Sequence, residues 1–168
     1  MSKQKNPLDL YEDMKAGRIK LAQKQEDSVT ITLLNQYLAM LRVVYTVHQH
    51  SHWKCKGADF YGNHLLFQRL YEDAQKKADE TAEKLIGLFG NDALDHANQL
   101  PLMNELCKYH SDNFMENSFN AEKEFSTFAE DTYNRIKGIG EMSLGLDDMI
   151  MGHINQSETA QYLIKQNS

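Results

Sequence analysis

The chain has 168 residues, of which 41% are hydrophobic and 25% are charged, and this balance is ordinary for one globular domain with its own core. Its formal net charge is −6, which disfavours a body that binds nucleic acid or anionic membrane through general positive charge. We find no run of about 18 apolar residues and no apolar signal-peptide core, so we expect a cytoplasmic protein that does not insert into membranes.

Residues 1–27 form a polar segment of mixed charge, with six Lys or Arg and five Asp or Glu. We expect this segment to be a tail that is flexible at least at its start. The remainder, residues 28–168, is expected to form one helical domain.

A long helix is predicted to begin near Ser28, a common N-cap residue type, and to end at Gly57. Its inward stripe recurs at spacings of three and four residues and comprises Leu34, Leu38, Leu41, Tyr45, His48 and His52. His50 lies about 160° around the axis from His48 and His52, so we expect it at the surface.

A second long helix follows and stops at the sequence FGND. Its predicted inward stripe comprises Phe60, His64, Phe67, Tyr71, Ala74, Ala78, Ala82 and Leu85. Residues 91–117 lack such a pattern, apart from a short helix that is expected to begin at Pro101.

Two further helices are predicted, from about Ser118 to Gly138 and Gly140, and from about Leu144 to Ile164. Four long helices with one long connection in the middle are typical of a ferritin-like four-helix bundle. We therefore predict an all-α fold of this kind, with the short extra helix in the connection between the second and third helices.

The second helix carries His64, Gln68, Asp79 and Glu83 on one face, at roughly 0°, 40°, 60° and 100° around its axis. Carboxylates beside an apolar stripe are costly unless they are paired or bound to a cation. Imidazole with carboxylate suits iron, manganese or zinc, although a single buried histidine is more often a hydrogen-bonded core residue than a ligand.

A single chain cannot bring these groups onto one ion, because His64 and Asp79 are separated by about 22 Å along the helix axis. A two-fold axis between two chains removes this obstacle. Two antiparallel copies of the helix set His64 of one subunit opposite Asp79 and Glu83 of the other, and they produce two identical sites. Any metal site of this kind is therefore expected between subunits.

Residues 50–90, HSHWKCKGADFYGNHLLFQRLYEDAQKKADETAEKLIGLFG, resemble the signature of the Dps family, the mini-ferritins named as DNA-binding proteins from starved cells. The family pattern is His-Trp-x3-Gly-x2-Phe, then Leu/Val-His, then Asp-x3-Glu. The matching residues are His52, Trp53, Gly57, Phe60, His64, Asp79 and Glu83. Asn63, which precedes His64, departs from the pattern.

The resemblance implies a hollow dodecamer of 23 symmetry with ferroxidase centres at its two-fold interfaces. At each centre, His52 and His64 of one subunit and Asp79 and Glu83 of another would be both metal ligands and catalytic residues. Ferrous iron would be oxidised, preferentially by hydrogen peroxide, and stored as ferric mineral, which protects against oxidative damage. Zinc and manganese are alternative ions for the same site.

The alternative function is a DNA-binding, nucleoid-condensing protein in which iron oxidation is secondary. Family members that condense DNA commonly use a lysine-rich tail. Here residues 1–27 carry a net charge of +1, and the other 12 Lys or Arg and 19 Asp or Glu give residues 28–168 a net charge of −7. We therefore expect DNA binding to be weak, with twelve tails as its only source of avidity.

Gln68 departs from the family, which usually has an acidic residue four positions after the second histidine. A carboxamide offers an oxygen but no charge, so this ligand is weakened or missing unless water or Glu72 takes its place. Trp53 is either an aromatic anchor of the interface or, as the resemblance implies, an interceptor of radicals beside the iron site.

Asp147 and Asp148 lie at the start of the fourth helix, where negative charge is favourable. The resemblance makes them candidates for lining the three-fold pores, through which ferrous ions would enter the shell. We find no coherent partners for His96, His110 and His153, and we assign them no role.

Overall fold

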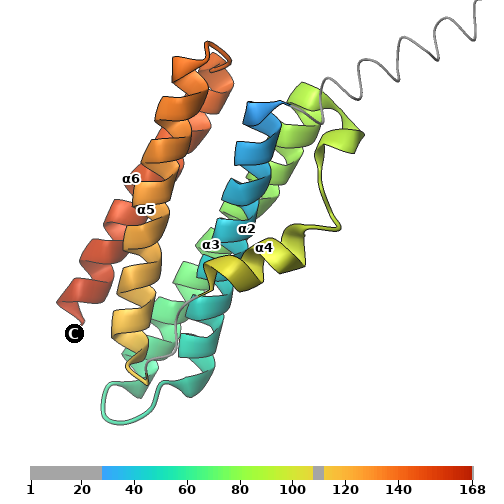
Figure 1. The fold of residues 1–168 in the computed structure, drawn as a ribbon. Helices are drawn as coiled ribbons and strands as arrows, with labels where there is room; N and C mark the ends of the chain where they lie inside the picture. The colour runs from blue at the N-terminus through green and yellow to red at the C-terminus, as the bar shows by residue number, and fades with distance from the viewer. Residues whose placement is uncertain (1–27, 108–111, 168) are drawn as a thin grey trace, which may run out of the picture.

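The computed structural model describes residues 28–107 and 112–167, and this part of the chain contains helices and no strands. Its elements are α2 (Val29–Lys54), α3 (Phe60–Phe89), the single 3₁₀ turn η1 (Asn91–Ala93), α4 (Gln99–Leu106), α5 (Phe114–Gly138) and α6 (Leu144–Gln166) (Figure 1). The all-α prediction is confirmed. The expected tail, residues 1–27, and His110 lie outside the described residues.

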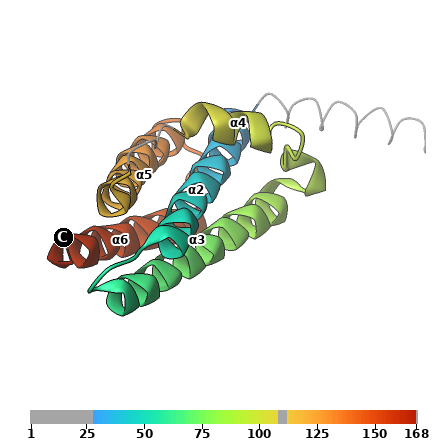
Figure 2. The same ribbon diagram turned by 90° about the horizontal axis from the view of Figure 1, so that it is seen from below.

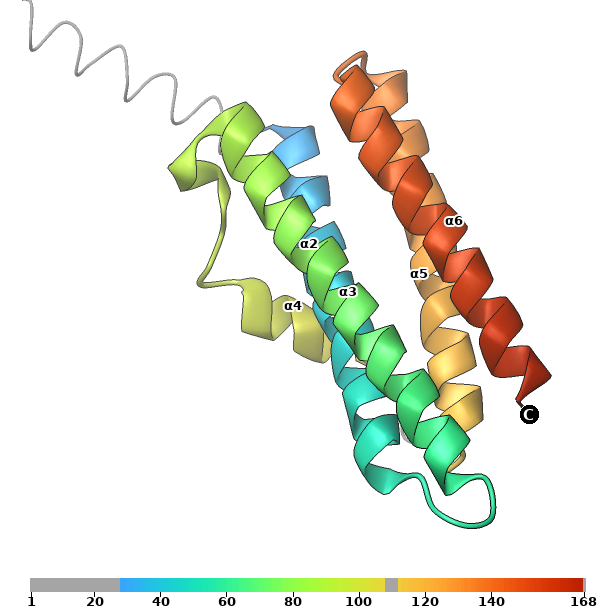
Figure 3. The ribbon, with the colours of Figure 1, turned by 180° about the vertical axis from the view of Figure 1, so that it is seen from behind.

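The four long helices form two antiparallel pairs, α2 with α3 and α5 with α6, and the pairs lie face to face (Figures 1 and 3). The connection that contains η1 and α4 runs along the outside of α2, so α3 and α5 point in the same direction. Figure 2 shows α4 lying across α2 on the side away from α6. One long crossover is the topology of the ferritin-like bundle, which confirms the predicted fold.

Helix α2 lies at the centre of the molecule and contacts α3, α4 and α5. It is consequently buried around most of its circumference, whereas the sequence indicated one inward stripe. Leu34, Leu38, Leu41 and His48 of that stripe are fully buried. No helix of the described segments is long and apolar enough to cross a membrane.

The buried stripe of α3 is rotated from the predicted one and comprises Phe67, Leu70, Ala74, Lys77, Thr81 and Leu85. Phe60 is exposed, and Ala78 and Ala82 are only half-buried. The two alanines line a surface hollow, while the long aliphatic stem of Lys77 turns inward and its Nζ lies 5.6 Å from the centroid of the Phe125 ring. The predicted stripe did not include this lysine, whose amphipathic side chain allows its aliphatic part to be buried.

Three helix boundaries differ from the predictions. Helix α2 ends at Lys54 rather than at Gly57, and α4 begins at Gln99 rather than at Pro101. Helix α5 begins at Phe114 rather than at Ser118, because the side chain of Asn113 accepts a hydrogen bond from the Glu116 N–H at 3.1 Å and caps the first turn.

Candidate metal centre

His52 and His64 bring the ends of α2 and α3 together through a reciprocal pair of hydrogen bonds. His52 Nδ1 lies 2.9 Å from the carbonyl oxygen of His64, and His64 Nδ1 lies 3.1 Å from the carbonyl oxygen of His52. The two rings stack with their centroids 3.7 Å apart and their planes at 22°. Residues twelve positions apart in the chain thus form one compact imidazole pair.

This geometry fixes the tautomer of both rings. A carbonyl oxygen only accepts hydrogen bonds, so each Nδ1 carries the hydrogen and donates it. Each Nε2 then presents a lone pair. Metal-binding histidines generally donate their other ring N–H to a carbonyl or carboxylate in this way, which orients the ring and raises its basicity. Both rings therefore keep an unprotonated Nε2 that is available to a metal ion.

Aromatic side chains and one thiol surround the imidazole pair. The ring of Phe60 stacks on His64 with centroids 5.0 Å apart, and the ring of Tyr71 meets His52 edge-on at 5.3 Å. The thiol of Cys55 donates to the carbonyl oxygen of His52 at 3.2 Å and lies 3.9 Å from His64 Nδ1. These contacts pack side chains against both rings and help to hold them in place.

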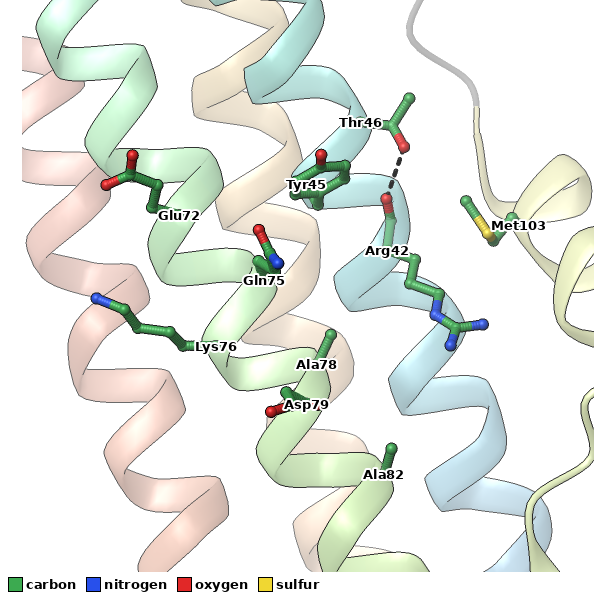
Figure 4. Close-up of a pocket in the computed structure, with 10 residues that line it drawn as sticks. All are labelled: Arg42, Tyr45, Thr46, Glu72, Gln75, Lys76, Ala78, Asp79, Ala82 and Met103. Carbon is green, nitrogen blue, oxygen red and sulfur yellow. Dashed lines mark hydrogen bonds between the residues drawn. The ribbon is translucent and has the colours of Figure 1, made fainter.

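The two predicted carboxylate ligands lie farther along α3, on its exposed side. Asp79 lines a hollow of about 730 Å³ between α2, α3 and α4, with Arg42 and Met103 across from it (Figure 4). Glu83 lines a second hollow of about 300 Å³, together with Glu80 and Lys84.

The structure does not bring the four predicted ligands together within one chain. Among the described residues, no group of three or more His, Cys, Asp or Glu side chains is arranged to hold a metal ion. One subunit therefore carries two separate halves of a possible site. The imidazole half lies at the α2–α3 turn, and the carboxylate half lies about four turns along α3.

Gln68, which lies where the family resemblance implies an acidic residue, has a partner on its own helix. Its Nε2 donates to Glu72 Oε1 at 2.9 Å. The amide therefore holds a carboxylate one turn farther from His64. Asp73 instead makes surface contacts with Arg69 and Lys76, at 3.8 Å and 3.7 Å.

Sequence reasoning missed a buried acid–imidazole pair inside the bundle. His48 Nε2 lies 2.8 Å from Glu122 Oε1, both side chains are fully buried, and the hydroxyl of Ser157 also donates to Glu122. Burial by itself would raise the pKa of Glu122, but the hydrogen bond and charge of His48, the charge of Lys77 and the hydrogen bond of Ser157 hold it below its usual range. The available signal was the place of Glu122 on the inward stripe of α5.

The expectation that His153 has no partners was wrong. This side chain is buried on α6, with Nδ1 3.2 Å from the hydroxyl of Tyr37 and Nε2 3.3 Å from Glu80 Oε2. Its spacing from Ile150 and Met149 placed it on the inward stripe of α6, but the sequence could not show that Tyr37 of α2 lies opposite.

The remaining residues singled out from the sequence lie at the surface or at a helix start. His50 is exposed, as predicted, and its ring centroid lies 5.6 Å from that of Trp53, which is 63% exposed. His96 is exposed. Asp147 lies in the first turn of α6, where Ser143 accepts a hydrogen bond from the Leu146 N–H and caps the helix.

Comparisons with known proteins agree with this architecture. A family model described as a ferritin-like domain matches residues 31–144. Over 60 residues the chain is 33% identical to DNA protection during starvation protein 2 of Bacillus anthracis, a match that covers 36% of this chain and 41% of that protein. The matched segments span less than half of the length of each curated relative found.

Solved structures match over most of the chain. Dps from Thermosynechococcus elongatus has a TM-score of 0.73 and 19% identity, and the match covers 86% of this chain and 92% of that one. Dps from Vibrio cholerae O1, described as a member of a broad superfamily of ferritin-like diiron-carboxylate proteins, has a TM-score of 0.69 and 22% identity over 88% and 90% of the two chains. At these identities the likeness concerns the fold.

Proposed function

The chain belongs to the ferritin-like domain family, and we propose that it is a mini-ferritin of the Dps type that oxidises ferrous iron and stores the ferric product inside a shell of identical subunits. The observation that carries this proposal is the imidazole pair of His52 and His64. Their reciprocal backbone hydrogen bonds engage both Nδ1 atoms and leave two unprotonated Nε2 atoms, and no carboxylate among the described residues joins them in a metal-binding group.

The missing half of the site comes from a second subunit. In an antiparallel two-fold pair of α3 helices, the Nε2 atoms of His52 and His64 face the partner subunit's Asp79 and the partner subunit's Glu83. The exposed position of both carboxylates on α3 supports this arrangement, since neither is enclosed by its own chain. Each pair of subunits then contains two identical sites, and twelve subunits with 23 symmetry would contain twelve.

Ferrous iron is the substrate of this site, with hydrogen peroxide as the oxidant. The imidazoles supply neutral nitrogen ligands and the carboxylates supply the negative charge that favours the ferric product. Phe60 and Tyr71 pack aromatic surface against the imidazole pair. Zinc and manganese fit the same donor atoms, so the ligand set alone does not select iron.

Three further residues would have defined positions in the assembled shell. Asp147 and Asp148, near the start of α6, would line the three-fold pores and attract ferrous ions inward. The exposed ring of Trp53, one residue after His52, would become covered at the two-fold interface. The protein would work in the cytoplasm, where iron and peroxide meet.

DNA condensation is the second candidate function. The name of the Bacillus anthracis relative favours it, but the match covers about a third of this chain. The net charge of −7 over residues 28–168 opposes binding through the body of the shell. A gel-retardation assay at low and moderate salt separates the two functions. Retention of DNA at moderate salt by a shell that does not oxidise iron would favour condensation as the main function.

Subunit complementation tests the shared site. The single variants His52→Ala and Glu83→Ala should each lose peroxide-driven iron oxidation, because each damages every site. When the two variants are unfolded together and reassembled in equal amounts, half of the two-fold pairs are mixed, and each mixed pair contains one intact site. The reassembled shells should therefore recover about a quarter of the wild-type rate.

His50→Ala is the matched control, because His50 is exposed on the same helix and points away from the site. It should keep the wild-type rate, and light scattering should give a mass near twelve times 19.4 kDa for every variant. A stable monomer would refute the shared site, since one chain cannot bring His64 to Asp79. Failure of the mixed shells to exceed the single variants would refute it as well.

A further inference from the structure

Tyr37 is a buried tyrosine whose hydroxyl group faces a proton acceptor, the imidazole of His153. Its side chain is fully buried on α2, and its hydroxyl lies 3.2 Å from His153 Nδ1 on α6. The two rings are stacked, with centroids 6.0 Å apart and planes at 20°. Neither residue belongs to the proposed metal centre.

The contact between His153 and Glu80 determines which atoms donate and which accept hydrogen bonds. Glu80 Oε2 lies 3.3 Å from His153 Nε2, and a carboxylate only accepts, so Nε2 carries the hydrogen of the imidazole. Nδ1 is then the unprotonated nitrogen and accepts from the Tyr37 hydroxyl. The line Tyr37–His153–Glu80 therefore runs from the core to a carboxylate whose side chain is 56% exposed.

The surroundings of Tyr37 oppose a separate loss of either its proton or an electron. The ring of Phe125 meets it edge-on at 5.3 Å, and that of Phe128 lies 6.5 Å away. Burial and then the charge of Glu80 raise the pKa of the Tyr37 phenol far above its usual value. Loss of an electron alone would leave a buried cation without a partner, which is also costly. Loss of both leaves a neutral phenoxyl.

We propose that Tyr37 and His153 form a redox-active pair, in which Tyr37 is oxidised reversibly to a tyrosyl radical while its phenol proton moves to His153 Nδ1. The resulting imidazolium lies next to the Glu80 carboxylate, so its charge is paired. Burial lowers the pKa of His153, although Glu80 opposes this effect and Lys77 adds to it. The proton therefore returns readily when the radical is reduced.

The pair of Tyr37 and His153 would take part in iron oxidation as an electron and proton donor. This part of the inference rests on the proposed function. Glu80, at the outer end of the line, shares its surface hollow with the candidate ligand Glu83. When one ferrous ion reduces peroxide, the products are a ferric ion, hydroxide and a hydroxyl radical. Tyr37 gives the hydroxyl radical one electron, which forms a second hydroxide, and gives its proton to His153.

A second ferrous ion then returns an electron to the phenoxyl, and His153 returns the proton. The sum is two ferrous ions and one peroxide giving two ferric ions and two hydroxides, with Tyr37 and His153 unchanged. The pair would thus complete the reaction at sites where only one ferrous ion is in place. This is the condition that the neutral amide of Gln68 favours.

Flash oxidation without iron tests the pair independently of ferroxidase activity. The assembled, iron-free shell is illuminated with ruthenium tris-bipyridine and an irreversible electron acceptor, then frozen for electron paramagnetic resonance. We expect a long-lived tyrosyl signal that is lost in Tyr37→Phe and retained in Tyr162→Phe, whose ring is 61% exposed. In the wild type, formation of the signal should be slower in D2O, because a proton moves with the electron.

His153→Phe should also lose the long-lived signal, and circular dichroism with shell elution checks that it folds. If it does not fold, Tyr37→Phe and the D2O comparison still decide. An unchanged signal in Tyr37→Phe, or equal rates in H2O and D2O, would overturn the proposal. With ferrous iron and peroxide, Tyr37→Phe should release more spin-trapped hydroxyl radical per iron oxidised. Equal release would overturn the role in iron oxidation, whereas a shell that oxidises no iron would refute the proposed function alone.

Discussion

Two histidines one turn apart on α2 have opposite surroundings. His48 is fully buried, and its Nε2 is 2.8 Å from Glu122 of the same chain. His52 is half-buried, and its hydrogen bond is made by Nδ1 to the carbonyl oxygen of His64, so its Nε2 is directed elsewhere. His48 is thus a core group that is paired with a carboxylate through Nε2, while its buried Nδ1 has no hydrogen-bond partner among the described residues. His52, on the same helix face, is instead one half of a candidate site.

This difference between His48 and His52 indicates which of the two groups would need a second subunit to complete it. Inside the bundle, the carboxylate of Glu122 is hydrogen-bonded to the imidazole of His48, and the charge of Lys77 also stabilises it, so three helices together compensate this buried anion. At the α2–α3 turn two imidazoles come together without an anion. Buried polar groups generally need a partner within the folded chain, whereas partly exposed ones do not. The pair of His52 and His64, called the open pair below, is therefore the one that is available to a ligand.

The largest effect is expected from breaking the buried pair. His48→Ala leaves the Glu122 carboxylate in the core with one imidazole fewer to compensate its charge, and the cost should be about 3 kcal/mol of unfolding free energy. For a chain of this length the thermal midpoint should fall by about 10 °C. Differential scanning calorimetry at one fixed subunit concentration measures the change.

The matched variant of the open pair is His52→Ala in the iron-free protein. It removes one hydrogen bond at a half-buried position and should cost about 1 kcal/mol, while it abolishes iron oxidation. A cost equal to that of His48→Ala would mean that His52 is a core residue and that the two regions do not differ.

Neutralising Glu122, the acid of the buried His48–Glu122 pair, should cost no more than His48→Ala does. Glu122→Gln keeps the shape of the side chain and removes its charge, so the unfolding free energy at neutral pH should fall by about 1.5–3 kcal/mol. The pKa of Glu122 is lower in the folded protein than its ordinary value of 4.5. Its contribution is therefore complete above about pH 4.5 and is lost as the pH falls through the folded pKa.

Unfolding of the wild type and Glu122→Gln over the acid range measures this dependence. The difference between the two proteins should be constant from neutral pH to about pH 5 and should shrink at lower pH. A difference that grows on acidification would mean that Glu122 is protonated in the core and that the pKa direction is reversed.

The fold could be predicted from the sequence because it depends on long periodic patterns. Four long helices, one crossover and the outward place of His50 all follow from residue spacing. The start of α5 could not be found in this way, because the cap at Asn113 precedes the first buried residue of that helix by five positions. The inward turn of Lys77 depends on Phe125 and Glu122 of a distant helix, which no local pattern contains.

The residues of the candidate site remain a prediction from the sequence, and the structure shows how one chain arranges them. The spacing along α3 indicated that one chain could not bind a metal through His64, Asp79 and Glu83 together, and the described residues form no such group. The reciprocal hydrogen bonds between His52 and His64 were not predictable, since they depend on how the turn at residues 55–59 brings two backbones together. The partners of His153 were missed for the same reason.

Gln68 gives the finest test of the open pair, because it decides how much negative charge accompanies the imidazoles. Each proposed site has two imidazoles and two carboxylates, with a neutral amide where the family usually has a third carboxylate. The amide of Gln68 donates to Glu72, so the nearest spare carboxylate is held one turn away from His64. We therefore expect one well-held ferrous ion per site and a second that binds weakly without oxidant.

Gln68→Asp should raise the affinity for ferrous iron by about 1–3 kcal/mol, because an ionised group then faces the ion directly. It should also speed the first turnover. Gln68→Asn is the control, since it shortens the side chain by the same amount and stays neutral, and it should not gain affinity. Anaerobic calorimetry with ferrous iron measures both variants. Equal stoichiometry and affinity in the wild type and Gln68→Asp would mean that Glu72 or water already occupies the place of the missing acid, because only an existing ligand there makes an added carboxylate redundant.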